Sequence, residues 1–182
     1  MKTRYVYAML LAMAVSGNAQ AQDAGHKIAV VNIQSIMKDS TAAKSVREQL
    51  QQKQKTFQSE ITKKEEALKA EDQELAKQRS VLSKEAFEKK AEAFRKKATD
   101  MQKEVQSKKA MLDNGFEQAL TEIQQTTTTI IAELAKEKGF TVAIPTSQIL
   151  YADTTTDISD DVLEQLNKKL PKLTVKFEAA KN

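Results

Sequence analysis

Two long stretches of the chain place apolar side chains at helical spacing. Between residues 87 and 105 they recur at steps of three and four, which keeps them on one face of a helix. Between residues 46 and 82 a thinner stripe has heptad-related spacing. The first stripe is Phe87, Ala91, Phe94, Ala98, Met101 and Val105, and the second is Val46, Leu50, Phe57, Ile61, Leu68, Leu75 and Leu82. The pattern predicts two long amphipathic helices.

The two stripes match each other as the legs of an antiparallel hairpin. In such a hairpin the numbers of facing residues add to a constant, and layers such as Leu75 with Ala91 add to 166, with alternate layers adding to 165. These sums place the turn near Ser83, a good N-cap for the returning helix. We therefore predict a helical-hairpin arm over residues 43–138, roughly 60 Å long. A parallel coiled coil between chains is the main alternative.

The spacing changes where the returning helix approaches the base of the arm. Two successive steps of four form a stutter, and the facing positions of the outgoing helix repeat it in reverse. The stutter comprises Leu112, Phe116 and Leu120, which face Gln54, Leu50 and Val46. Gly115 lies inside it, where glycine costs about 1 kcal/mol relative to alanine. Our hypothesis for this glycine is a flexible point in the arm.

The flanking segments predict a small body. Residues 27–33 (KIAVVNI) form a β-branched run typical of a buried strand, and Ser40 or Thr41 is expected to cap the outgoing helix. Gly139 is expected to end the returning helix. A strand at 140–144 should then pair with residues 148–152 as a hairpin.

A short helix should follow the second strand. Ser159 is its expected N-cap, Asp160 and Asp161 lie in its first turn, and Pro171 ends it. The tail 173–177 alternates weakly and is open to interpretation as an added strand or as disorder. The predicted fold is thus α+β and mostly α.

The body, residues 22–42 and 139–182, is too small to bury a full core alone. Oligomerisation through the body would cover its exposed sheet edges, with the arms projecting from it. The residues expected in this oligomer body are Ile28, Val30, Phe140, Val142, Ile144 and Leu150.

The first residues are typical of a secretory signal peptide. Lys2 and Arg4 precede an apolar run over 5–15, and Ala19-Gln20-Ala21 gives an A-x-A cleavage site. We expect cleavage near Ala21 and export. The run is shorter than the ~20 residues that a membrane-anchoring helix needs. The exported chain contains no cysteine, so no disulfide can stabilise it.

The residues offer little for catalysis or metal binding. The one histidine, His26, lies beside the processed end, and there is no cysteine to act as nucleophile or metal ligand. The paired carboxylates Asp160 and Asp161 are explained as charges at a helix N-terminus. We expect no enzyme activity, cofactor or metal.

Three features together resemble the Skp/OmpH family of periplasmic chaperones: the signal peptide, IAVVNIQSIMKDSTAAKSVREQL before a long basic hairpin, and KGFTVAIPTSQILYADTTTDISDDVLEQLN after it. The resemblance covers about residues 27–169. It implies a homotrimer whose strands form a joint β-barrel, with three helical arms that enclose unfolded outer-membrane proteins. It also implies an ATP-independent holdase without nucleotide, metal or catalytic step. The tail after Lys169 extends past the family pattern and receives no role.

The charge distribution of the arm suggests how clients would be held. From Lys44 to Lys109 there are 18 basic and 12 acidic residues, and such an excess would attract acidic clients or anionic lipid and lipopolysaccharide surfaces. The alternative is an ordinary solvated face with i,i+4 pairs such as Glu60 with Lys64. The candidate client-binding cations are Lys63, Lys64, Lys89, Lys90, Arg95, Lys96 and Lys97.

Apolar client contacts are expected from partly exposed side chains of the arm. Methionine and aromatic side chains adapt to varied partners, so Phe57 and Met111 are candidates, whereas Phe87, Phe94 and Met101 fall in register with the hairpin seam. A structural adaptor or spacer of the cell envelope is the alternative function. Export argues against a nucleic-acid partner.

Overall fold

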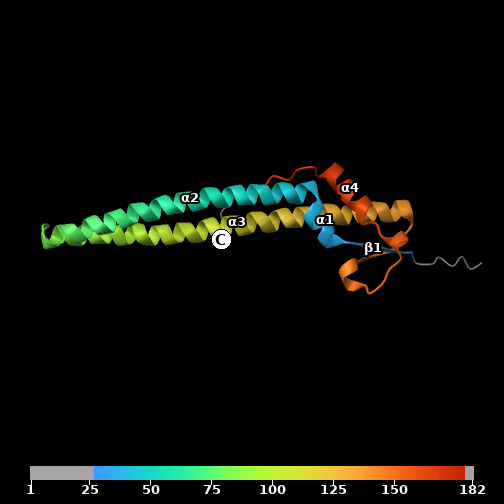
Figure 1. Cartoon of the computed structure of the whole chain (residues 1–182), viewed down its shortest axis with the longest axis horizontal. Helices are drawn as coiled ribbons and strands as arrows, with labels where there is room; N and C mark the ends of the chain where they lie inside the picture. The colour runs from blue at the N-terminus through green and yellow to red at the C-terminus, as the bar shows by residue number, and fades with distance from the viewer. Residues whose placement is uncertain (1–26, 179–182) are drawn as a thin grey trace, which may run out of the picture.

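A computed structural model describes residues 27–178, and its dominant feature is one long hairpin of two helices (Figure 1). Helix α2 (Thr41–Gln78) runs outward, a loop turns the chain at 79–83, and helix α3 (Lys84–Lys138) returns. The predicted antiparallel hairpin and the position of its tip are confirmed. The predicted signal peptide, 1–21, and His26 lie outside the described residues.

Serine side chains start both arm helices, as predicted. The Ser40 hydroxyl accepts a hydrogen bond from the Ala43 amide at 3.2 Å, and the Ser83 hydroxyl accepts one from the Ala86 amide at 3.3 Å. Each side chain satisfies an amide that lacks a partner within the helix. Gly139 ends α3 with a φ of 73°, a left-handed conformation that favours glycine. Local capping chemistry therefore sets where the arm begins, turns and ends.

The body packs short elements around the base of the arm. Strands β1 and β2 lie parallel, with Ile28 opposite Val142 and Val31 opposite Pro145. Asp157 adds one parallel bridge on the other side of β1, at Val30. The elements of the body are β1 (Ile28–Val31), α1 (Ile33–Asp39), β2 (Val142–Pro145), the 3-10 helices η1 (Thr146–Gln148) and η2 (Thr154–Thr156), and α4 (Ser159–Lys169).

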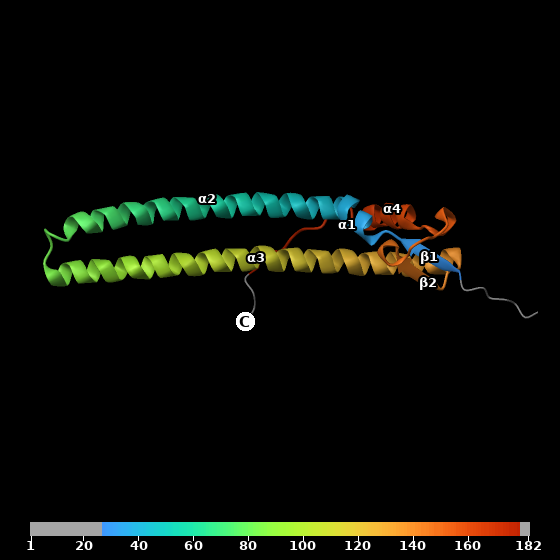
Figure 2. The same ribbon diagram turned by 60° about the horizontal axis from the view of Figure 1, so that its bottom comes forward.

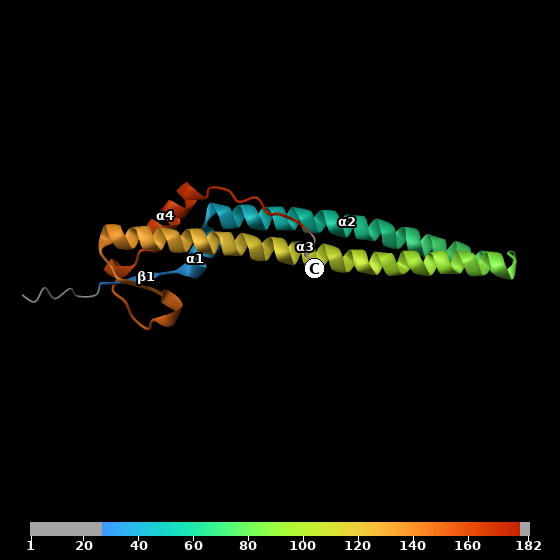
Figure 3. The ribbon, with the colours of Figure 1, turned by 180° about the vertical axis from the view of Figure 1, so that it is seen from behind.

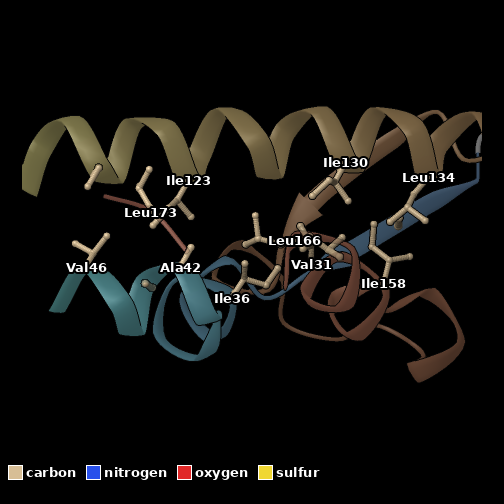
Figure 4. Close-up of a cluster of buried hydrophobic side chains, with 14 of the residues drawn as sticks. Val31, Ile36, Ala42, Val46, Ile123, Ile130, Leu134, Ile158, Leu166 and Leu173 are labelled. Atoms are coloured by element: carbon tan, nitrogen blue, oxygen red, sulfur yellow. The ribbon is translucent and has the colours of Figure 1, made fainter. Parts of the chain in front are cut away.

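One hydrophobic core joins the body to the base of the arm. Figure 4 shows Ile130 and Leu134 of α3 pointing into the core, on the side where Leu166 of α4, Val31 and Ile36 lie. These side chains are at most 2% exposed. The last turns of α3 are therefore held by the body, because its apolar face is covered there by α1, β1 and α4.

Two predictions about the body are wrong. Residues 148–152 form no strand, and β2 pairs with β1 instead; Leu150 is fully exposed and Tyr151 is 84% exposed. Ser159 also does not cap α4. Its hydroxyl accepts a hydrogen bond from the Asn32 amide at 2.7 Å, which ties α4 to the start of α1.

Near the base of the arm, the buried face of α3 differs from the face that the apolar pattern predicted. Val105 and Phe116 are 36% and 41% exposed, whereas Gly115 and Ala119 are buried. Buried positions then continue at steps of four, so the stutter is present but displaced by one residue. A third segment, the C-terminal tail, packs at this level and favours small side chains beneath it.

The tail 171–178 runs back from α4 along α2 and enters the space between the two arm helices (Figures 2 and 3). It is extended and belongs to no helix or strand. Leu173 and Val175 are each 6% exposed. A Cβ on Gly115 would lie 2.9 Å from Val175 Cγ1 and 3.0 Å from the Lys176 carbonyl oxygen. Helix α3 is unbroken at Gly115, and the tail approaches it closely there. Gly115 therefore has a packing role.

Candidate functional site

All seven predicted client-binding cations lie on the exposed surface of the distal arm. Lys97 forms an ion pair with Glu71 on the opposite helix at 2.8 Å, and Lys90 donates a hydrogen bond to Gln78 at 2.6 Å. Within residues 27–178, no ion pair engages Lys63, Lys89, Arg95 or Lys96. These four charges are therefore available to an incoming chain.

A ladder of ion pairs joins the two helices of the arm, and some of the predicted cations belong to it. Lys64 pairs with Glu104, and Lys108 pairs with Glu60 and with Glu104, the latter at 3.2 Å. The i,i+4 pair expected between Glu60 and Lys64 is replaced by these cross-hairpin contacts. The numbers of the cross-hairpin partners add to 168, close to the predicted 165 and 166. Pairs of this sum lie beside the apolar seam and agree with the predicted register to within a few residues.

The ladder changes the protonation of its members. Hydrogen bonds donated by Lys64 and by Lys108 hold the pKa of Glu104 below its ordinary range. The hydrogen bond donated by Lys108 is the main cause that lowers the pKa of Glu60. The same hydrogen bond, which Lys108 donates to Glu60, raises the pKa of Lys108, and desolvation opposes this shift in part. The Lys108 side chain is only 12% exposed. The charged forms of all three groups are thus favoured in the folded arm.

Acid should weaken the arm through this ladder. A carboxylate with a depressed folded pKa stabilises the fold above its unfolded pKa, about 4.3, and this contribution is lost as pH falls through the folded value. We expect the melting temperature of the parent to fall more between pH 6 and pH 3 than that of the Glu60→Gln/Glu104→Gln variant, measured by circular dichroism. Equal losses in the two proteins would contradict the ladder.

The apolar candidates of the arm divide into two groups. Met111 is half-buried and accessible from outside, and so are three seam residues, Phe87, Phe94 and Met101. Phe57 is only 8% exposed, which contradicts the expected partial exposure. The Nζ atoms of Lys53 and Lys108 lie 4.8 and 4.6 Å from its ring centroid and cover it.

Two shallow notches with apolar floors and charged rims lie between the helices of the distal arm. One has a volume of about 330 Å³ and contains Leu68 and Met101 between Lys64 and Lys97. A second, of about 220 Å³, contains Phe94 and other residues nearer the tip. Such surfaces can accept an apolar side chain while cations contact polar groups beside it. They hold no deep, enclosed pocket of the kind that fixes one small ligand.

The predicted oligomer residues of the body fall into exposed and buried sets. Ile28 and Val142 face outward at 48% and 46% exposure, and Leu150 is fully exposed. Val30 and Phe140 are buried within the chain, and Ile144 is half-buried. The sequence reading missed Tyr151 beside Leu150, although the unbroken apolar run ILYA marks it. The oligomer role of this set stays a prediction.

The residues that hold the tail were not predicted from the sequence. Gln49 of α2 bonds the tail backbone through both ends of its side-chain amide, and Gly115 of α3 makes room for it. Two signals could have indicated this contact: the alternation at 173–177 and an unexplained glycine inside a helix. Neither signal indicates that the two segments are in contact, because the segments are far apart in sequence.

Neither a metal-binding cluster nor a membrane-spanning helix occurs in the part of the chain that the structure describes. No cluster of three or more histidine, cysteine or acidic side chains there could hold a metal ion. No described helix combines the length and the apolar character needed to cross a membrane.

The fold and the arm can be compared with known proteins. A family model described as "Outer membrane protein (OmpH-like)" matches residues 27–166. No curated protein matches the chain. Among solved structures, the chain is similar to a candidate outer membrane chaperone (OmpH-like) from Caulobacter crescentus CB15, with a TM-score of 0.78 and 18% identity. The alignment covers 99% of this chain and 98% of that one.

The match to the solved structure supports the fold alone, because the two sequences differ at most positions. The family match carries more, because it spans most of the chain, from β1 into α4. The resemblance predicted from the flanking motifs is confirmed. This chain therefore belongs to the OmpH-like family of outer membrane proteins, which is not an enzyme family.

Proposed function

We propose that this protein is an ATP-independent holdase of the periplasm, which binds unfolded outer-membrane proteins and prevents their aggregation. The observation that carries the proposal is the distal arm. There a half-buried apolar seam, with Phe94 and Met101, lies beside exposed cations on a hairpin that projects from the body. A surface of this kind offers many weak contacts and favours no single sequence.

Weak contacts at many points suit a chaperone that releases its client without fuel. Apolar segments of a client can enter the shallow notches beside Met101 and Phe94, while the unpaired cations attract acidic groups over a longer range. Since each contact is small and reversible, the client can leave when a better partner offers more burial. Anionic lipid or lipopolysaccharide surfaces are a second class of partner for the same charges.

We also propose that three chains assemble through the body and complete a β-barrel. The two-stranded sheet of the described chain is too small to be stable by itself, and Ile28, Val142 and Leu150 present exposed apolar side chains around it. A trimer would bury these side chains and point three basic arms in one direction. Cleavage near Ala21 would release the mature chain into the periplasm.

Dilution of a denatured β-barrel membrane protein tests the function. We expect the mature protein to suppress light scattering at a ratio near one oligomer per client, with an equal mass of an unrelated helical protein as control. Unchanged scattering would contradict the holdase and favour an envelope adaptor or spacer. A solution mass measurement of the same sample decides the oligomeric state, and a monomer would overturn the shared barrel.

A further inference from the structure

The tail between α2 and α3 is bound in the way that an extended peptide is bound. The Gln49 side-chain amide donates to the Leu173 carbonyl at 2.6 Å and accepts from the Val175 amide at 3.0 Å. These bonds reach two backbone groups flanking Thr174, as a neighbouring β-strand would. Because they involve only backbone atoms of the tail, they do not depend on its side chains.

Alternate side chains of the tail enter the groove between α2 and α3 that is lined by Gln49 and Gly115. Leu173 and Val175 are buried, Phe177 is half-buried, and Thr174 and Lys176 point to solvent. Figure 4 shows Leu173 beside Ile123 of α3. The groove thus favours an extended chain in which every second side chain is apolar.

The walls of the groove fit this ligand closely. Gly115 forms one wall without a side chain, and any Cβ there would meet Val175 and the Lys176 carbonyl. At the outer end, the Lys53 Nζ lies 5.6 Å from the Phe177 ring centroid and also covers Phe57. The groove therefore supplies a backbone clamp, a space for an aliphatic side chain and a cation beside an aromatic ring.

We propose that this groove is a binding site for extended client segments whose residues alternate between apolar and polar, and that the tail occupies it as an internal substitute. Alternation of this kind is the signature of the strands of membrane β-barrels, so the inference rests on the proposed function. A client segment displaces residues 173–177 and takes over the two bonds to Gln49. The tail thereby sets how readily the groove admits a client.

The tail competes at a high effective concentration because it is tethered directly after α4. Short tethers give effective concentrations on the order of millimolar, so the parent protein should bind a free peptide weakly. Releasing the tail should therefore increase the affinity for a suitable peptide by at least about tenfold.

The test uses the full chain with single substitutions. Val175→Asp places a carboxylate where the groove is apolar and releases the tail, whereas Thr174→Asp adds the same charge at an exposed position and leaves the tail bound. Gln49→Met in the Val175→Asp background keeps the size of the side chain but removes the backbone clamp. The probe is a fluorescent, lysine-flanked peptide in which leucine, valine and phenylalanine alternate with threonine, followed by anisotropy.

We expect Val175→Asp to bind this peptide at least about tenfold more tightly than the parent or Thr174→Asp. Adding Gln49→Met should remove the gain, and a peptide of equal composition with its apolar residues in one block should show none. A Val175→Asp affinity equal to that of Thr174→Asp, or a gain that survives Gln49→Met, would overturn the groove site.

Amide exchange in the parent gives a second measurement that does not depend on variants. The Val175 amide is hydrogen-bonded, and saturating alternating peptide should remove its protection; retained protection would overturn the proposal. The aggregation assay separates this inference from the holdase function. If the parent suppresses client aggregation but Val175→Asp gains no affinity for the peptide, the groove site is rejected and the holdase function is not. If the peptide binds but client aggregation is not suppressed, the holdase function is rejected.

Discussion

Reversing Lys63, Lys89 and Lys96 to glutamate should reduce client capture at low salt by tenfold or more. All three side chains are exposed, and no ion pair within the described chain engages them. The arm, residues 44–109, has 18 basic and 12 acidic residues, so three reversals leave equal numbers of each. The long-range attraction that we propose to guide an acidic client to the arm would then be lost. Every 1.4 kcal/mol of lost interaction lowers the affinity by a factor of ten.

The matched control reverses three lysines of the body, Lys27, Lys38 and Lys172, which are also exposed. This variant has the same net charge but leaves the arm basic, so we expect it to capture clients nearly as the parent does. Raised salt should weaken capture by the parent, because exposed charges are screened beyond about 10 Å at 0.1 M ionic strength. Capture that is equal in both variants and independent of salt would contradict charge-guided binding.

The Leu166→Ala substitution should lower the free energy of unfolding by about 2 to 5 kcal/mol. The side chain is fully buried and belongs to the core that joins α4 to α1 and α3 (Figure 4). The next residue, Asn167, accepts a hydrogen bond from the Thr41 amide at 2.8 Å, at the start of α2. Since helices surround the site, it cannot close fully around the cavity, which favours the upper part of the range.

Denaturant unfolding followed by circular dichroism measures this loss. Both proteins are compared at one concentration, because the proposed assembly would add to the apparent stability. Val81→Ala at the tip is the control, since Val81 is 80% exposed and surface substitutions usually change stability by less than about 0.5 kcal/mol. Losses of unfolding free energy of similar size in the two variants would show that α4 does not hold the base of the arm.

The hairpin was predictable because its information is local and repeated. Period, caps and pair sums located both helices and the tip at Ser83, and the cross-hairpin ion pairs agree with that register within a few residues. The prediction failed near Phe116, since the apolar pattern assumed two helices only. The inserted tail makes Gly115 and Ala119 the buried residues instead.

The body shows the limit of local patterns more clearly. The β-branched runs located β1 and β2, but a run of this kind does not identify its partner. An adjacent segment, 148–152, was expected to pair with β2, whereas the true partner is β1, more than a hundred residues earlier. A helical arm lies between the two strands in sequence, and only its return brings their backbones together.

The candidate site was predicted in part. The distal cations are exposed, as a basic face requires, but the sequence could not tell which of them bond across the hairpin and which stay unpaired. The burial of Phe57 was also missed, because it depends on Lys53 and on Lys108 of the opposite helix. Such contacts depend on how the two helices are placed relative to each other. Neither the helical period nor the composition specifies this placement.

By itself, the sequence determined a long basic hairpin on a small body and the membership of the chain in its family, because helical period, capping residues and motifs act over short distances. The tertiary structure alone decided the parallel strand pairing, the displaced seam and the clamp of Gln49 on the tail. Each of these joins segments far apart in the chain, and their partners are selected by which surfaces remain to be buried once the hairpin has formed.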